Sequence, residues 1–306
     1  MLADLIIGKK LEDRQNLYFI RVPGQKRIYA SALDLDISTK FEDWIEKDLL
    51  NVEKDSIDQI VLRDYSINER TGRVVERDVV KLDKKDGTWK TDRMPSRKEV
   101  DSTKIGDLLT TIDELSIVGV RAKPQGLSSS LKRTEGGVSI TQADLLSLQS
   151  KGYYFTRDGS LLSNEGEMEV RTTGGITYTL RFGEILYGTG EAISAGSDTS
   201  DDSQSGPGEN RYLFVTSSFD DSSLPEPRKP GNTAFETKPE EEWTDEDKRN
   251  KELRDKHAEW ERTVEQNREL SETLNARFAD WYYVISSASF DKTRVKRSEI
   301  LTDKAS

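Results

Sequence analysis

The sequence predicts an α+β protein, predominantly antiparallel β-sheets in two similar modules, with short packing helices and one long charged helix. Three observations lead to this prediction. Short apolar and aromatic stretches alternate with turns that contain Gly, Pro, Asn or Asp, as in antiparallel hairpins. A two-strand pattern occurs in both halves of the chain. Near the C-terminus, Thr244 and Asp247 form a capping box that opens a stretch with heptad spacing.

The repeated unit is a short strand closed by Gly and followed by an apolar, aromatic strand. Its first copy comprises residues 5–11 and 17–22, its second copy comprises residues 180–186 and 211–215, and the aromatic strand returns at 281–285. Because β-strands resemble one another in composition, true duplication and chance similarity both stay open.

The first module is predicted to span residues 1–123 and to contain two helices. Pro23 and Gly24 favour a type II-like hairpin turn. A capping box at Thr39 predicts a helix that runs to Leu49 and covers a sheet. The other expected elements are β-structure over 57–92, a helix that begins at Asp101 or Ser102, and a short strand over 117–122.

The second module is predicted to span residues 124–306. A capping box at Thr141 predicts a third helix, and two hairpins follow it. Residues 188–210 are rich in Gly, Ser, Thr and Asp, which is typical of a disordered, mobile loop. Residues 221–242 are Pro-rich and acidic and are expected to form a linker to the long helix, residues 244–280.

The long helix should measure about 55 Å, since an α-helix rises 1.5 Å per residue. Its seam, spaced alternately by four and three residues, comprises Leu253, His257, Trp260, Val264, Asn267, Ser271, Leu274, Phe278 and Trp281. Either the helix lays this seam on its own sheet, or part of the seam binds a partner helix or a second copy of the chain. The candidate partner-binding residues are Leu253, His257, Trp260, Val264 and Leu274.

Composition narrows the class of function. The net charge of −11 argues against broad binding to a nucleic-acid backbone, and the absence of Cys excludes disulfides and thiolate chemistry. The sequence has no run of roughly 18 apolar residues that would span a bilayer. The chain opens almost directly on a strand, so we expect Met1 to head a fragment of a longer precursor.

No catalytic, metal-binding or cofactor-binding residue is predicted, and no cofactor is expected. The only histidine, His257, lies on the helix seam, and the sequence contains no phosphate-binding loop or Gly-x-Ser-x-Gly motif. A carboxylate pair for glycoside hydrolysis stays open but unassigned. The basic stretch 292–297 is interpreted as the solvent face of a strand. Four strand aromatics raise the alternative of stacking on sugars: Tyr153, Tyr154, Tyr282 and Tyr283.

Several stretches resemble a bacterial family of uncharacterised proteins, domain-of-unknown-function family 4340. They are residues 5–10, 17–24, 38–50, 151–155, 163–167, 175–184 and 277–286. With its long charged helix, the sequence is similar to the planctomycete-type branch of that family.

The resemblance implies a protein held by one N-terminal transmembrane helix, with its β-rich part outside the cytoplasm, and an association in some relatives with gliding-motility-type ABC transporter components. We therefore expect a soluble part of a membrane-anchored protein, whose anchor is absent from this sequence. A cytoplasmic location stays open. The expected function is a non-enzymatic, envelope-facing accessory module that binds protein partners or itself through the long helix. The alternatives are a carbohydrate-binding module and a carboxylate-based hydrolase.

Overall fold

The computed structural model describes residues 4–11, 16–34, 45–46, 48–68, 71–132, 140–156, 159–188 and 208–304. The chain divides into two units, Met1–Trp44 and Ile45–Ser306. Most of the loop expected over 188–210 and the start of the helix expected from Thr39 lie outside the described residues. The end expected for that helix is wrong, because residues 45–46 and 48–49 are not helical and Asp48 instead forms a β-bridge with Ser116.

The first unit contains one three-stranded antiparallel sheet, in the order β1 (Ile6–Lys10), β2 (Leu17–Arg21), β3 (Ile28–Ala32). The turn between β2 and β3 confirms the prediction from sequence. Gly24 has a φ of 80°, and the N–H of Gln25 donates to the carbonyl of Val22 at 3.1 Å. A positive φ at the second central position is what a type II turn requires.

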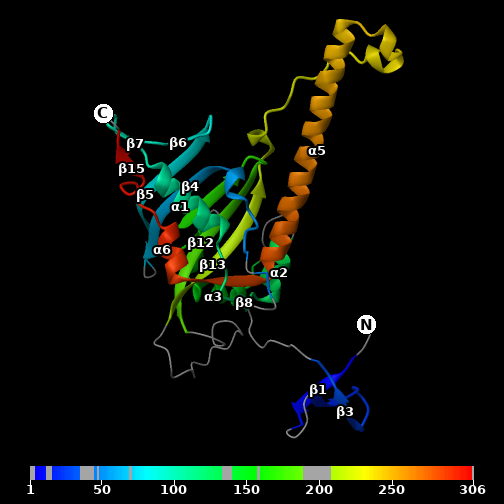
Figure 1. Ribbon diagram of the computed structural model, residues 1–306. Helices are drawn as coiled ribbons and strands as arrows, with labels where there is room; N and C mark the ends of the chain where they lie inside the picture. The colour runs from blue at the N-terminus through cyan, green and yellow to red at the C-terminus, as the bar shows by residue number, and fades with distance from the viewer. Residues whose placement is uncertain are drawn as a thin grey trace. The chain divides into compact units, whose positions relative to one another are not determined.

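The second unit is built on an eight-stranded sheet in the order β6-β5-β4-β11-β12-β13-β14-β8 (Figure 1). Its neighbouring strands are all antiparallel, which confirms the predicted fold class. The strands are β4 (Ile57–Asn68), β5 (Arg73–Lys85), β6 (Thr88–Thr91), β8 (Gly119–Ala122), β11 (Glu167–Thr172), β12 (Ile176–Tyr187), β13 (Glu209–Phe219) and β14 (Trp281–Ser286).

The sheet corrects the expected division of the chain at residue 123. β4 pairs with β11 and β8 pairs with β14, so strands from both sides of that position share one sheet. The division lies instead after Trp44. The two copies of the repeated unit also differ in setting, because β1 and β2 lie in the small sheet whereas β12 and β13 lie inside the large one.

One face of the large sheet carries the main core. It is covered by α1 (Ser102–Asp113), α6 (Ser287–Thr293) and the C-terminal half of α5 (Asp245–Ala279). Buried side chains alternate along each strand, as expected where a sheet has one face in the core. On β12, for example, the core face carries Ile176, Tyr178, Leu180 and Phe182.

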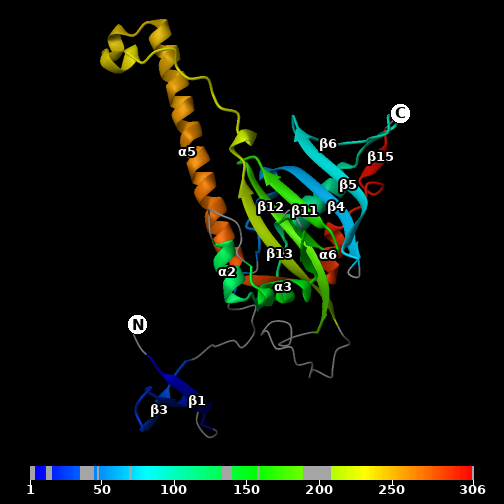
Figure 2. The same cartoon turned by 180° about the vertical axis from the view of Figure 1, so that it is seen from behind.

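The opposite face is covered at the β13–β14–β8 end (Figure 2). There, α2 (Gln125–Leu131), α3 (Gln142–Gln149) and the hairpin of β9 (Tyr153–Phe155) and β10 (Leu161–Ser163) form a second core. Two short strands, β7 (Lys98–Val100) and β15 (Leu301–Asp303), form a separate ladder.

The helix starts follow the predicted caps. The Asp101 carboxylate accepts two backbone N–H groups at the start of α1. Capping boxes at Thr141 and Thr244 open α3 and α5, with Asp144 and Asp247 as the reciprocal acceptors. Such caps satisfy N–H groups that have no partner within the helix.

Candidate functional site: the long helix, a charged cavity and an exposed sheet

The C-terminal half of α5 packs on β13. Leu274 and Phe278 belong to the main core, and the Phe278 side chain is only 1% exposed. Between α5 and β13, the hydroxyls of Ser271 and Ser217 lie 3.0 Å apart. Asn275 accepts the N–H of Ser217 at 2.7 Å and donates to its carbonyl. Here the seam of the helix lies on its own sheet.

Lys123 fixes the C-terminal end of α5. Its ammonium donates to the carbonyl of Phe278 at 2.9 Å, and its backbone N–H donates to the carbonyl of Asp280 at 2.8 Å. The same ammonium lies 3.9 Å from the centre of the Phe214 ring. Burial lowers the pKa of Lys123 to about 7, with the nearby Asp280 carboxylate opposing that shift.

The N-terminal half of α5 is covered by the segment that joins it to β13. Residues 221–242 of this segment were expected to form a linker, but the segment contacts the helix through specific groups. The indole N–H of Trp260 donates to the carbonyl of Leu224 at 3.2 Å. His257 lies between two carboxylates, with Nε2 3.1 Å from Glu226 and Nδ1 3.4 Å from Glu261.

The tip of this half has a small core of its own. It combines the helix start with the 3₁₀ turns η4 (Ala234–Thr237) and η5 (Glu240–Glu242). Phe235 is buried there against the Trp243 ring at 6.1 Å, and the Arg254 guanidinium stacks over it at 5.0 Å. An ion pair of 2.9 Å joins Lys238 to Asp247, which holds the pKa of Asp247 at about 2. We call residues 225–260 the arm.

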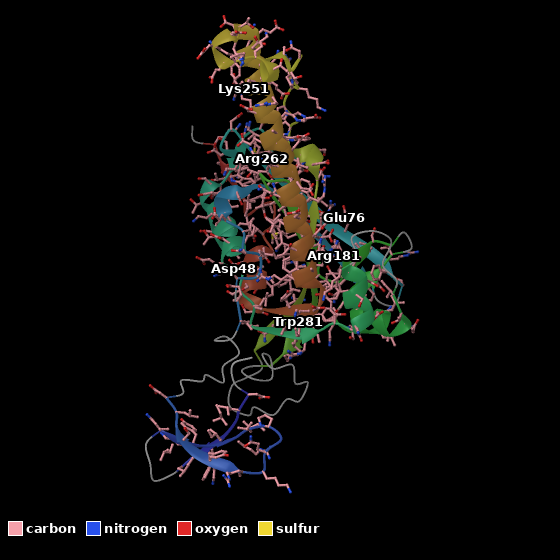
Figure 3. All side chains as sticks on the ribbon, turned by 90° about the vertical axis from the view of Figure 1, so that its right-hand side faces the viewer. Asp48, Glu76, Arg181, Lys251, Arg262 and Trp281 are labelled. Carbon is pink, nitrogen blue, oxygen red and sulfur yellow. The ribbon has the colours of Figure 1, made fainter. Side chains whose placement is uncertain are left out.

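The five candidate seam residues therefore face their own chain. Val264 and Leu274 are buried, and Leu253, His257 and Trp260 are half-buried. Figure 3 shows the length of α5 along which the seam lies, from Lys251 in the arm past Arg262 to Trp281, just beyond the helix. Binding of a partner through the seam stays a prediction, and in this structure intramolecular contacts occupy that face.

A cavity of about 570 Å³ lies where β4, β5, β11 and β12 meet the segment after α6. Two aspartates on its wall, Asp64 and Asp78, are direct cross-strand partners. Like charges opposite each other destabilise a sheet unless they are compensated. Here Arg77 and Arg294 bind Asp64 at 2.7 and 3.1 Å, and Arg297 binds Asp78 at 3.2 Å.

These arginines lower the pKa of Asp64, through the hydrogen bond from Arg77 first and that from Arg294 second. Arg294 also binds Glu165 at 3.0 Å. The basic stretch 292–297 thus belongs to α6 and the loop after it, and it binds the sheet. The interpretation as the solvent face of a strand is wrong, because its arginines are used to neutralise carboxylates of distant strands.

Glu167 has the opposite electrostatic environment, because burial raises its pKa. A raised and a lowered carboxyl pKa in one cleft would favour acid–base chemistry. However, Glu167 pairs in register with Arg63, one residue before Asp64, so the two acids project from opposite faces of the sheet. Glu167 meets Tyr65 and Arg181 there, at 3.5 and 3.3 Å.

The tyrosines considered for sugar stacking are largely internal. Tyr153 and Tyr282 are fully buried and stack on each other with ring centres 6.1 Å apart. Tyr283 is buried in the main core, and Tyr154 is half-buried. Buried rings offer no face to a sugar, so this arrangement gives the carbohydrate-binding alternative no support.

The small sheet of the first unit differs from every other sheet in its exposure. The side chains of Ile6, Ile28 and Tyr29 are 45%, 62% and 42% exposed. Register places Ile7, Ile20 and Tyr29 in one cross-strand row, so Ile28 and Phe19 lie on the other face. Both faces are therefore apolar. The sequence predicted these strands, but no sequence pattern indicated that their apolar side chains would be exposed.

Two classes of site are not seen in the part of the chain that the structure describes. Its His, Asp and Glu side chains do not gather in groups of three or more that suit a metal ion. None of its helices has an apolar stretch long enough to cross a bilayer.

Comparison with known proteins gives one family. The family model described as "Domain of unknown function (DUF4340)" matches residues 2–130. This match confirms the resemblance over the first unit and over the second unit as far as α2. No curated protein and no solved structure matches the chain.

Proposed function

We propose that this chain, whose residues 2–130 belong to the DUF4340 family, is a non-enzymatic accessory module that binds a protein partner through the sheet β1–β2–β3. The observation that carries the proposal is the exposure of apolar side chains on both faces of that sheet. Contiguous exposed apolar surface marks an interaction site, because each Å² removed from water contributes about 25 cal/mol.

The chemistry of the second unit supports a non-enzymatic role. In its described part, the carboxylates that line the cavity are bound by arginines, and this includes Glu167, the carboxyl with the raised pKa, which pairs with Arg181 at 3.3 Å. His257 is engaged by Glu226 and Glu261. These groups hold the fold together and are not placed around a common substrate position.

The family resemblance directs the choice of partner and location. An association with ABC-type complexes of the bacterial envelope makes such a complex the first partner to test. The envelope-facing location is part of the same proposal.

Site-specific photo-crosslinking in the native cell tests the proposal. A photoreactive amino acid at position 28 should give an adduct with a partner protein, because Ile28 is the most exposed of the apolar side chains on the sheet. The matched control is position 76 on β5, where the exposed Glu76 belongs to the large sheet of the second unit (Figure 3). Adducts of equal yield at both positions, or none at position 28, would contradict the proposal.

A further inference from the structure

Two surfaces of the chain carry charge without ion-pair partners among the described residues. The first is the three-stranded sheet, whose basic residues are Lys9, Lys10, Arg21, Lys26 and Arg27. We call it the basic sheet. The second is the acidic tip, whose exposed acids are Glu240, Glu241, Glu242 and Asp245.

Within the described part of the chain, the charges of these two surfaces lack the ion pairs that neighbouring residues of the arm form. Along the arm itself, Lys251 pairs with Asp255, Lys256 with Glu252, and Arg254 with Glu236. The helix dipole accounts for Asp245, since acids in a first helical turn are stabilised by it. It does not account for Glu240–Glu242, which precede the cap residue Thr244.

The backbone of the acidic tip is also held in place by contacts on both of its sides. The buried Phe235, the ion pair of Lys238 with Asp247 and the capping box fix the chain on both sides of η5. A fixed loop loses less conformational entropy on binding than a flexible one. Pro239 is exposed and Trp243 half-exposed beside the three glutamates, so the tip offers apolar as well as charged groups.

We infer that the acidic tip of one copy binds the basic sheet of a second copy. The inference rests on the proposed function, which makes the sheet a docking surface, and it names the occupant. Charge complementarity carries the choice: the sheet presents exposed Ile28 and Tyr29 beside Lys26 and Arg27, and the tip presents the matching acids beside Pro239.

The contact is heterologous, because each copy contributes a different surface. Each copy then retains one free tip and one free sheet, so association proceeds head to tail. Exposed ion pairs are individually weak and are screened by salt. The association is therefore weak, concentration-dependent and sensitive to ionic strength.

Sedimentation velocity of the full chain tests this at 50 and 500 mM NaCl, concentrations chosen to vary the Debye length about threefold. We expect dimers and larger species at low salt and an apparent dissociation constant that rises about tenfold at high salt. Two variants separate the surfaces: E240K/E241K/E242K makes the tip basic, and K9E/K10E/K26E/R27E makes the sheet acidic, because only Arg21 then remains basic. Each alone should be monomeric, because its tip and sheet then carry the same sign.

Mixing the two variants provides the decisive measurement. The basic tip of one then meets the acidic sheet of the other, and the unchanged tip and sheet also match, so association should return. The control E259K/E269K/E272K changes the net charge equally at exposed positions of α5 and should associate like the unmodified chain. Circular dichroism verifies the fold of every variant.

A chain that stays monomeric at low salt, or variants that do not associate when mixed, would overturn the inference. The crosslink at position 28 keeps the two proposals apart. An adduct with the mass of two chains supports self-association. An adduct with a different protein, from a chain that is monomeric in solution, retains the docking sheet and removes the second copy as its occupant.

Discussion

The two halves of α5 share one heptad spacing but are covered by different parts of the chain. The C-terminal half buries Leu274 and Phe278 in the main core on β13. The N-terminal half lies against residues 220–243 and is held by the Trp260 hydrogen bond, by His257 between two acids and by the small core at Phe235. A heptad pattern therefore indicates that one face of a helix is covered, but it does not indicate which part of the chain covers that face.

The contacts of the two halves of α5 also differ in the free energy that they contribute to stability. Burial of large apolar side chains contributes several kcal/mol, whereas exposed ion pairs contribute about 1 kcal/mol or less. The C-terminal half should thus unfold with the sheet, and the arm should open separately at lower cost. Three variants test this contrast.

The largest effect is expected for Phe278→Ala in the C-terminal half. Removing a fully buried ring from the main core should lower the free energy of unfolding by about 3–5 kcal/mol. Chemical denaturation measures it. Leu270→Ala on the same helix is the control, because Leu270 is 46% exposed and its loss should cost little. Equal losses in both variants would mean that this half of α5 is not part of the cooperative core.

A smaller effect is expected for Lys123→Met at the end of α5, and it should appear as a change in how the free energy of unfolding depends on pH. The folded pKa of about 7 lies below the ordinary lysine pKa of 10.5, so unfolding takes up a proton between these values. Stability of the unmodified chain should rise with pH in that window, by up to about 1.4 kcal/mol per pH unit from this group. The variant should lack this increment.

Denaturation at pH 7, 8 and 9 measures the difference between the two chains. This range stays below the titration of the core tyrosines, including Tyr282 and Tyr283, whose pKa values burial raises to about 12. A difference that does not change with pH would show that Lys123 remains charged when buried.

The smallest global effect is expected for Phe235→Ala in the arm. The midpoint of thermal unfolding should move by only about 1 °C, because the arm opens apart from the sheet. Trypsin should nevertheless cleave faster after Arg228 and Arg249, which no proline follows, by about tenfold, since cleavage follows the population of the open arm. Exposed Thr233→Ala is the control. A loss of stability as large as that of Phe278→Ala would break the contrast between the two halves.

Local features of the fold were predictable from the sequence. Capping boxes at Thr141 and Thr244, the Pro23-Gly24 turn and the period-2 pattern of residues 176–182 each depend on neighbouring residues, and the structure contains all of them. The same reasoning gave the fold class.

Pairings over long separations were not predictable. β8 pairs with β14, about 160 residues away, so a boundary at residue 123 looked reasonable in the sequence and was wrong in space. Likewise, the sequence around Arg294 and Arg297 does not indicate that their ion-pair partners are Asp64 and Asp78. The candidate site was not predictable for a related reason, because the exposure of the apolar side chains of β1–β2–β3 is a property of the folded sheet and is not encoded in neighbouring residues.

The facing aspartates of β4 and β5 have a consequence for how this protein is made. Arg294 lies 230 residues beyond Asp64, and Arg297 lies 219 residues beyond Asp78. During translation, β4 and β5 leave the ribosome early. The guanidinium groups of Arg294 and Arg297 follow only when almost the whole chain has been synthesised. Non-local contacts of this kind slow folding and prolong the exposure of unpaired strands. A chain truncated shortly before residue 294 would keep Arg77 beside Asp64 but would lack Arg294 and Arg297, so Asp78 would stand opposite Asp64 without its arginine.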